Sequence, residues 1–400
     1  MPIQVKNIIL DKFGGLDNVN PPEKSNGGLQ TVSNFFVTDG GQLDTRQGYS
    51  RKVTCVPHSL WSDGDVCLYR EGVYLKRLAE NLTTVSILRS DLQGSNAMQY
   101  LSLAGRIYYT DGIATGIVEN LTSRTWGLTV PSSPSVSLTS GWLAEGRYQV
   151  ALTYSRNDGQ ESGASLSAVI DVGANGGIIV SLPTSSDSTV EDVNLYATGC
   201  GGEVFFHVAS FSNGTASVTY TVGNPFGPAL RTQFLSPPLP GQFIAHYNGR
   251  IYTALNDIIW YTQPFAYELM DLAENFISMG ERVTMLESVQ DGLWAATESG
   301  TYFLAGDDAP LKRISKDDAG VIPGTAIKID GVNLGMKDGY SGPAVLWGSA
   351  KYGICAGLNG GQVQYLTDKR FRFPGENYRG AGVVRQEADE SNLYLMSIYQ

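Results

Sequence analysis

The pattern of apolar and polar positions along this chain is typical of short strands rather than helices. Between residues 243 and 306, runs rich in Ile, Val, Tyr, Trp and Thr are interrupted by short polar pairs. Asn248-Gly249 and Asn256-Asp257 interrupt the first half, and Asp291-Gly292 and Ser299-Gly300 repeat the device in the second half. Gly, Asn and Asp readily adopt the positive φ angles of type I′ hairpin turns. The stretch therefore predicts two successive β-meanders.

The two meanders begin about 40 residues apart, which is the repeat length of propeller blades. Similar units are found elsewhere in the chain, at residues 31–53, 59–78, 98–121 and 344–366. The phrase AGRIYYTDG around Arg106 also resembles NGRIYTALND around Arg250. Repeats of this kind predict a β-propeller of about six blades, with five or seven as alternatives.

Two linker-like passages interrupt the repeats. VPSSPSVSLTSG begins at Val130, and the Pro-rich VGNPFGPALRTQFLSPPLPG begins at Val222. Six or seven short alternating strands lie between them, a pattern that favours an inserted immunoglobulin or fibronectin-like β-sandwich without a disulfide. The predicted layout is an N-terminal extended arm (1–30), the first part of the propeller (31–130), the inserted sandwich (131–225) and the second part of the propeller (226–400).

A propeller has to protect the edges of its first and last strands. Pairing of N-terminal with C-terminal strands in one blade achieves this protection. We therefore predict that Leu393–Tyr399 lies in the same blade as strands from Phe35–Val53.

Two segments are candidate assembly contacts. The apolar run of the arm, with Val5, Ile8, Ile9 and Leu10, predicts an extended segment that packs along its own domain or a neighbouring subunit. A basic cluster near the C-terminus is either a solvated loop or a contact with an acidic neighbour in an assembly. Its members are Lys369, Arg370, Arg372, Arg379 and Arg385, offset by Asp368 and Glu376.

The composition adds a strong acidic bias to this picture. The formal net charge is −11, while charged residues make up only 17% of the chain. Residues 131–225 contain eight acidic and two basic side chains, so the insert contributes −6 of the total. This balance argues against a general nucleic-acid binder, because such binding depends on clustered Lys and Arg. It does not exclude a protein that DNA slides past, since an acidic wall repels phosphates.

Candidate catalytic chemistry is sparse. The histidines are His58, His207 and His246, and none has a His, Asp or Cys at ligand spacing. The sequence predicts no catalytic residue, no metal site and no cofactor. Paired acids at Asp63/Asp65, Asp307/Asp308 and Asp317/Asp318 keep open a glycosidase as a minor alternative.

Cysteine usage and hydropathy address the compartment. Cys55, Cys67, Cys200 and Cys355 are widely spaced, which favours reduced buried thiols over disulfides or a zinc site. No run approaches the roughly 20 apolar residues that span a bilayer, and residues 1–10 do not resemble a signal peptide. We expect a protein made in the cytosol, without stable membrane insertion.

Three stretches resemble the tail nozzle proteins, also called tail tubular protein B, of short-tailed bacteriophages. NFFVTDGGQLDTRQGYSRK, from Asn34, is similar to the opening blade of that family. YQVALTYSRNDGQESGAS, from Tyr148, is similar to the start of its inserted sandwich. HYNGRIYTALNDIIWYTQP and ISMGERVTMLESVQDGLWAATESGTYFLAG, from His246 and Ile277, are similar to its central pair of blades.

The resemblance implies a structural protein of the virion tail rather than an enzyme. It implies a hexameric ring that is assembled in the host cytoplasm, sits below the head-tail adaptor and contacts tail fibre or tail-tip proteins. DNA would pass through the channel without sequence-specific binding. The alternative is a propeller-based binding module that recognises a host surface glycan or protein.

Overall fold

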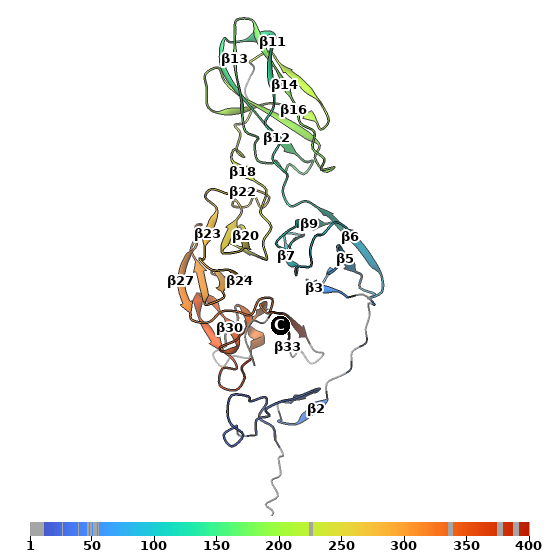
Figure 1. Ribbon diagram of the computed structural model, residues 1–400, viewed down its shortest axis with the longest axis vertical. Coiled ribbons are helices and arrows are strands. Elements are labelled where there is room, and N and C mark those ends of the chain that lie inside the picture. Colours follow the sequence, from blue (N-terminus) through green and yellow to red (C-terminus); the bar gives the residue numbers. More distant parts are fainter. Residues whose placement is uncertain are drawn as a thin grey trace, which may run out of the picture. The chain divides into compact units, whose positions relative to one another are not determined.

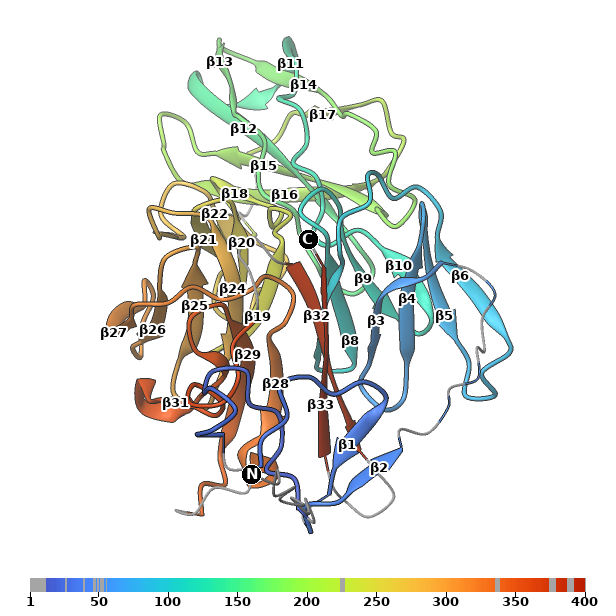
Figure 2. The same cartoon turned by 60° about the horizontal axis from the view of Figure 1, so that its bottom comes forward.

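The protein was described from a computed structural model (Figures 1 and 2). The described residues are 12–25, 27–38, 40–45, 48, 50, 54, 56–223, 227–334, 339–373, 379–386 and 392–399. Val5, Ile8, Ile9 and Leu10 therefore lie outside the described residues. The elements are β-strands and two short 3₁₀ segments, η1 (Gly331–Leu334) and η2 (Asn359–Gly361), which confirms the all-β prediction.

The chain divides into two compact units. The first combines Met1–Asp91 with Met279–Gln400, and the second is Leu92–Ser278. Both units contain four-stranded antiparallel sheets whose neighbouring strands follow one another in sequence, which is the topology of a propeller blade. Five such sheets are formed by the described residues, so the chain has a β-propeller fold with an inserted β-sandwich.

The first unit contains three of the blades. The first blade is β3 (His58–Ser62), β4 (Cys67–Glu71), β5 (Tyr74–Leu78) and β6 (Val85–Arg89). The second is β24 (Val283–Ser288), β25 (Leu293–Thr297), β26 (Thr301–Ala305) and β27 (Lys312–Asp317). The third is β28 (Ile327–Asp330), β29 (Pro343–Ser349), β30 (Gly353–Gly357) and β31 (Val363–Tyr365).

Tryptophans connect the second and third of these blades. The rings of Trp294 on β25 and Trp347 on β29 have centroids 5.7 Å apart within one buried cluster. Trp294 Nε1 donates a hydrogen bond of 3.1 Å to the carbonyl of Leu358. The ring nitrogen is therefore satisfied, as burial of an indole requires.

Two further sheets of the first unit have only two strands each. β1 (Phe35–Val37) pairs with β2 (Leu43–Thr45), and β32 (Arg379–Gln386) pairs with β33 (Asn392–Tyr399). The prediction that Leu393–Tyr399 shares a blade with strands from Phe35–Val53 is not met among the described strands. β33 instead forms a hairpin with its neighbour in sequence, in continuous register from Gln386↔Asn392 to Arg379↔Tyr399.

The second unit contains two blades and the insert. One blade is β7 (Gln99–Leu103), β8 (Arg106–Thr110), β9 (Thr115–Glu119) and β10 (Thr122–Arg124). The other is β19 (Phe243–Tyr247), β20 (Arg250–Leu255), β21 (Ile258–Tyr261) and β23 (Phe276–Ser278), with a small ladder of β18 (Leu235–Ser236) and β22 (Met270–Asp271). Tyr108, Ile117, Trp126, Ile244 and Ile251 form a buried cluster shared by the two blades.

The hairpin turns follow the sequence pattern in only part of the repeat. Asn248 and Gly249 have φ angles of 46° and 69°, and Asn256 has 54°. Asp291-Gly292 and Ser299-Gly300 join their strands without any residue of positive φ, so the expectation that they repeat the same device is wrong. A tight turn between antiparallel strands does not require a left-handed backbone when the loop type differs.

The inserted domain is a two-sheet sandwich. One sheet is β11 (Val136–Leu143), β14 (Gly176–Ser181) and β17 (Ser217–Tyr220), and the other is β13 (Ala168–Val172), β12 (Gly146–Ser155), β15 (Asp192–Thr198) and β16 (Phe205–Ser212). Inward-facing side chains such as Val150, Leu152, Ile178, Val180 and Val193 are fully buried between the sheets. Alternation along the strands provides this core, as in other sandwiches.

Candidate functional site

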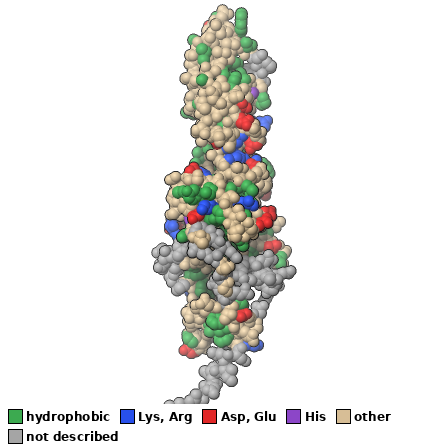
Figure 3. Space-filling view, turned by 90° about the vertical axis from the view of Figure 1, so that its right-hand side faces the viewer, with side chains coloured by type: hydrophobic (Ala, Val, Ile, Leu, Met, Phe, Trp, Pro, Cys, Tyr) green, Lys and Arg blue, Asp and Glu red, His purple; other side chains and the backbone are tan. Residues whose placement is uncertain are grey.

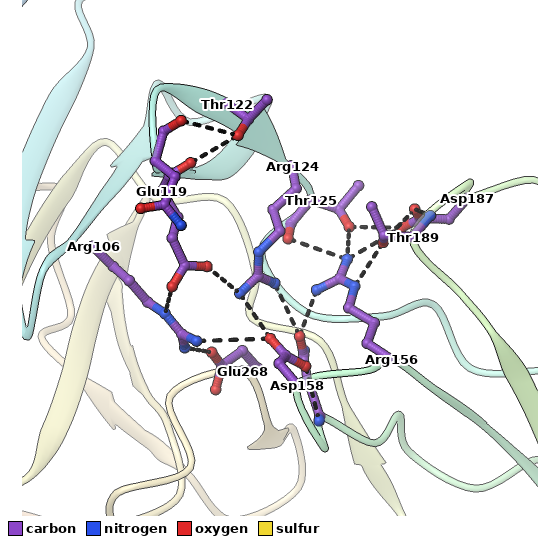
Figure 4. Close-up of polar contacts among 12 residues, drawn as sticks. Arg106, Glu119, Thr122, Arg124, Thr125, Arg156, Asp158, Asp187, Thr189 and Glu268 are labelled. Atoms are coloured by element: carbon purple, nitrogen blue, oxygen red, sulfur yellow. Dashed lines mark hydrogen bonds and ion pairs between the residues drawn. The ribbon is translucent and has the colours of Figure 1, made fainter.

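Arginines and carboxylates converge where the inserted sandwich meets the blades of the second unit (Figure 4). We call this group the junction cluster. Its charged members are Arg106, Glu119, Arg124, Arg156, Asp158, Asp187 and Glu268. Three arginines face four carboxylates, so the formal charge of the cluster is −1.

Regular structure positions the blade side of the cluster. Arg106 is the first residue of β8, Glu119 the last of β9 and Arg124 the last of β10, so all three side chains lie at strand ends of one blade. Glu268 comes from the segment before β22, where Trp126 Nε1 donates a 2.8 Å hydrogen bond to the adjacent carbonyl of Tyr267. This bond fixes the segment that carries Glu268 against the β7–β10 blade.

Tight turns position the sandwich side. Arg156 and Asp158 lie in the turn after β12, which closes through Gly159 N to Arg156 O at 3.1 Å, with Gly159 at φ 81°. The stretch SRNDGQESG therefore contains a tight turn. In the loop before β15, Asp187 Oδ1 accepts hydrogen bonds from the backbone N and the hydroxyl of Thr189, which is an Asx-type turn.

Arg106 holds three carboxylates from three segments. Its Nε lies 2.9 Å from Glu119 Oε1, its Nη1 lies 3.0 Å from Glu268 Oε1, and its Nη2 lies 3.7 Å from Asp158 Oδ2. Arg124 Nη2 lies 3.3 Å from both Glu119 Oε2 and Asp158 Oδ2. Asp158 is thus the sandwich residue that both blade arginines contact.

Arg156 is the buried end of the cluster, with a side chain only 4% exposed. Its Nη2 lies 3.3 Å from Asp187 Oδ2 and donates a 2.5 Å hydrogen bond to Thr125 Oγ1. Its Nε donates to Thr189 Oγ1 at 2.6 Å, and Nη1 donates to the Gln160 side chain. A buried guanidinium is tolerated only when its donors are used in this way.

The pKa values of the carboxyls follow their positions. The hydrogen bond from Arg106 lowers the pKa of Glu119 below its ordinary value, and Arg124 adds to the effect. Burial raises the pKa of Glu268, although Arg106 and Arg124 oppose that shift. The pKa of Asp187 is lowered because hydrogen bonds from Thr189 and Thr125 outweigh its desolvation.

On the face of the molecule that Figure 3 shows, acidic and basic side chains are intermixed rather than gathered by sign.

Three of the predicted basic contacts lie on one turn of the first unit, which meets the N-terminal arm. Arg370 Nη1 donates a 2.6 Å hydrogen bond to the carbonyl of Gly14, and the carbonyl of Lys369 accepts one of 2.9 Å from Asn20 Nδ2. Arg372 exchanges two bonds with the Asn18 side chain, at 2.9 and 2.8 Å. Arg379 lies apart from this turn as the first residue of β32, opposite Tyr399.

The described part of the arm therefore packs along its own unit. The pKa of Asp17 is lowered, chiefly by a hydrogen bond from the Asn20 backbone and to a small degree by the charge of Arg370. Sequence reasoning named the arm and the basic turn separately, but it did not predict their contact. No spacing rule connects residues about 350 positions apart in sequence.

The three histidines and Cys200 have hydrogen-bond partners. His207 Nε2 lies 3.1 Å from Ser210 Oγ, but the serine donates its proton to Asn194 Oδ1 at 2.7 Å. Cys67, Cys200 and Cys355 are free thiols, of which Cys355 is buried and Cys200 exposed; Cys55 lies outside the described residues. Within the described ranges, His, Cys, Asp and Glu form no group of three or more suited to a metal.

Among the residues that the structure describes, no helix is long and apolar enough to cross a membrane.

Comparison with known proteins was made at the levels of family, sequence and structure. No family model matches the chain, and no curated protein matches its sequence. Among solved structures, it is similar to the N-terminal domain of Nup159 (10% identity, TM-score 0.30, covering 91% of this chain and 81% of that one). It is also similar to BamB from Moraxella catarrhalis (10%, TM-score 0.27, 80% and 89%) and to BBS1N in complex with ARL6DN (11%, TM-score 0.29, 80% and 83%).

Proposed function

We propose that this protein is a structural component of a short-tailed bacteriophage tail, in which copies form a nozzle ring below the head-tail adaptor. The ring is hexameric, contacts tail fibre or tail-tip proteins, and conducts DNA without binding its sequence. The proposal rests first on the resemblance of three stretches to tail nozzle proteins. Those stretches correspond to the β1–β2 hairpin, to β12 with its turn, and to the blades from β19 to β26.

The observation that best supports a structural role is the junction cluster. Arg156 and Asp158 belong to the second resembling stretch. Asp158 forms ion pairs with the blade residues Arg106 and Arg124, and Arg156 donates a hydrogen bond to Thr125, the residue after β10. The charged side chains of the cluster are used to hold the sandwich on the blades. This arrangement suits a domain that has to keep a fixed orientation, since separating the partners would leave partly buried charges unpaired.

The test is the location of the protein in virus particles. Antibodies against the purified protein should label one end of purified particles of the phage that encodes it, and light scattering should give a mass of about six copies, alone or with the adaptor protein. Label on host cells without label on particles, together with a monomeric mass, would contradict the proposal.

Exposed aromatic side chains favour one second candidate, a binding module for a host surface glycan or protein. The side chain of Trp142 on β11 is 80% exposed, and Phe265 is exposed to the same extent. Exposed aromatic rings are common anchors in recognition surfaces. A glycan array that gives a signal for the protein and none for Trp142→Ala, with Leu166→Ala as the matched control, would favour this candidate.

A further inference from the structure

The β1–β2 hairpin is poorly covered for an element of a folded domain. Phe35 and Phe36 are each 47% exposed, and Leu43 is 37% exposed. Since adjacent residues of a strand point to opposite faces, Phe35 and Phe36 place an aromatic ring on each side of the hairpin. A two-stranded hairpin with two apolar faces is at best marginally stable in water. It is expected to gain stability by adding to a larger sheet.

The β32–β33 sheet has fewer strands than a blade and could accept a hairpin. It has two strands, whereas every blade described above has four. The backbone beside β32 is already used, because Gly380 N donates to Pro323 O at 2.9 Å and Gly382 N to Gly324 O at 3.1 Å. Among the strands that the structure describes, β33 pairs with β32 alone, so its other side is an edge eight residues long there. Long edges without protection are sites for strand addition.

The two edges also match in charge. β1 reads FFV and β33 reads NLYLMSIY, so neither strand contains a charged residue. Pairing them buries no unpaired charge, so no desolvation of an ion opposes the contact. In a chain with a net charge of −11, an uncharged strand pair is also a place where two copies meet with little repulsion.

We propose that the β1–β2 hairpin of one copy adds to the β33 edge of a second copy and completes a four-stranded blade there. In each chain the hairpin is tethered elsewhere. Phe13 N donates a 2.7 Å hydrogen bond to Gly41 O at its tip, and Asn18 N donates one of 2.8 Å to Arg370 O. While the arm holds the hairpin there, β1–β2 and β32–β33 remain separate two-stranded sheets in the described part of one chain. This contact concerns how copies join and does not depend on the virion assignment.

Cross-linking tests the contact directly. Phe36→Cys is combined with Ser397→Cys, an exposed position of β33, in a Cys200→Ser background that removes the exposed native thiol. With a short bismaleimide, we expect covalent dimers and higher multimers on a denaturing gel. The two variants that carry only one of the introduced cysteines, in the same Cys200→Ser background, should remain monomeric on the same gel. A cross-link confined to the monomer would mean that the hairpin closes its own blade, and absence of the multimers would equally overturn the proposal.

A charge substitution provides the second measurement. Phe35→Lys/Phe36→Lys should leave the fold of the monomer intact, because both rings are half exposed, and should weaken self-association at least about tenfold. Leu60→Lys, at a 68% exposed position of β3, is the matched control and should associate as the native chain does. Equal association of the double variant and the native chain would overturn the proposal. Antibody labelling of virus particles could still succeed in that case, so the two proposals fail separately.

Discussion

Arg106 and Arg250 occupy the same place in two blades of the second unit and make very different contacts. Each is the first residue of the second strand and follows a turn of two residues with positive φ, Ala104-Gly105 (51° and 77°) and Asn248-Gly249 (46° and 69°). Arg250 Nη1 donates a 2.7 Å hydrogen bond to Thr262 O, within its own blade and next to the ring of Tyr261. Arg106 instead joins the junction cluster.

The difference separates what a repeat specifies from what its surroundings add. The turn and the strand recur because the local sequence recurs, with Gly at the second left-handed position and Ile-Tyr after the arginine. The partners of the arginine depend on which segments the fold brings to that strand end. At Arg106 these include the sandwich turn with Asp158 and the segment with Glu268, 162 residues away.

The largest effect is expected at the buried end of the cluster. Arg156→Met removes the donors that satisfy Asp187, Thr125 and Thr189 in a site that excludes most water. Loss of one partner from a buried ion pair costs about 3 kcal/mol. Urea unfolding of the native protein and the variant, followed by tryptophan fluorescence, measures the change.

The matched control is Arg147→Met. Arg147 also pairs with a sandwich carboxylate, Asp171, at 3.1 Å, but both side chains are about 70% exposed. An exposed ion pair contributes little, so the control should change stability by less than about 0.5 kcal/mol. Equal effects of the two substitutions would contradict the structural role given to Arg156.

A direct comparison of Arg106→Met and Arg250→Met is the next test. We expect a loss of about 1.5 kcal/mol at Arg106, which leaves partly buried carboxylates unpaired, and of about 1 kcal/mol at Arg250, which leaves one carbonyl unpaired. Added salt should reduce the difference in free energy of unfolding between the native protein and Arg106→Met, because screening weakens ion pairs. The corresponding difference for Arg250→Met should hardly depend on salt. A reversed salt dependence would mean that the two arginines have been assigned the wrong roles.

Protonation of Glu119 gives a smaller, pH-dependent effect. Its pKa in the folded protein lies below the ordinary value of 4.5, so its contribution is complete above pH 4.5 and is lost as the pH falls through the folded pKa. Glu119→Gln should therefore cost about 1 kcal/mol near neutral pH and progressively less as the pH falls below 4.5. Unfolding curves across this pH range measure the convergence, with Glu145→Gln at an exposed carboxylate as the control. A difference in free energy of unfolding between the native protein and Glu119→Gln that stays the same at all pH values would contradict the role given to the Glu119 carboxylate.

The sequence predicts the blades better than it predicts the site. Short apolar runs and Gly or Asn at turns are local properties, so β7 to β10 and β19 to β26 fall near the expected positions. The junction cluster depends on residues brought together by the fold. Arg106 lies in the repeated phrase AGRIYYTDG, and Asp158 lies in the stretch that resembles the start of an inserted sandwich. Nothing in the sequence around Glu119, Asp187 or Glu268 indicates that these residues join the same cluster.

The arm shows the same limit from the other side. A basic cluster at Lys369, Arg370 and Arg372 was visible in sequence, and it predicted either a solvated loop or a contact with an acidic neighbour in an assembly. The structure places the Arg370 guanidinium against the Gly14 carbonyl, and the Arg372 backbone against the Asn18 side-chain amide, of the same chain. Neutral backbone and amide acceptors leave no charge pattern in a sequence, so electrostatic reasoning could not find them.

The smallest expected effect concerns the turns that the two blades share. Ala104 adopts a φ of 51°, where its Cβ crowds the following carbonyl at a cost of about 1 kcal/mol, whereas Asn248 tolerates the same region through its short polar side chain. Ala104→Gly should stabilise the second unit by about 0.5 kcal/mol, because relief of strain exceeds the added entropy of the unfolded chain. Asn248→Gly should be neutral or slightly destabilising. If thermal unfolding gave the two substitutions the same sign and size, the shared turn geometry would not carry the strain assigned to Ala104, and the likeness of the two blades would be confined to their strands.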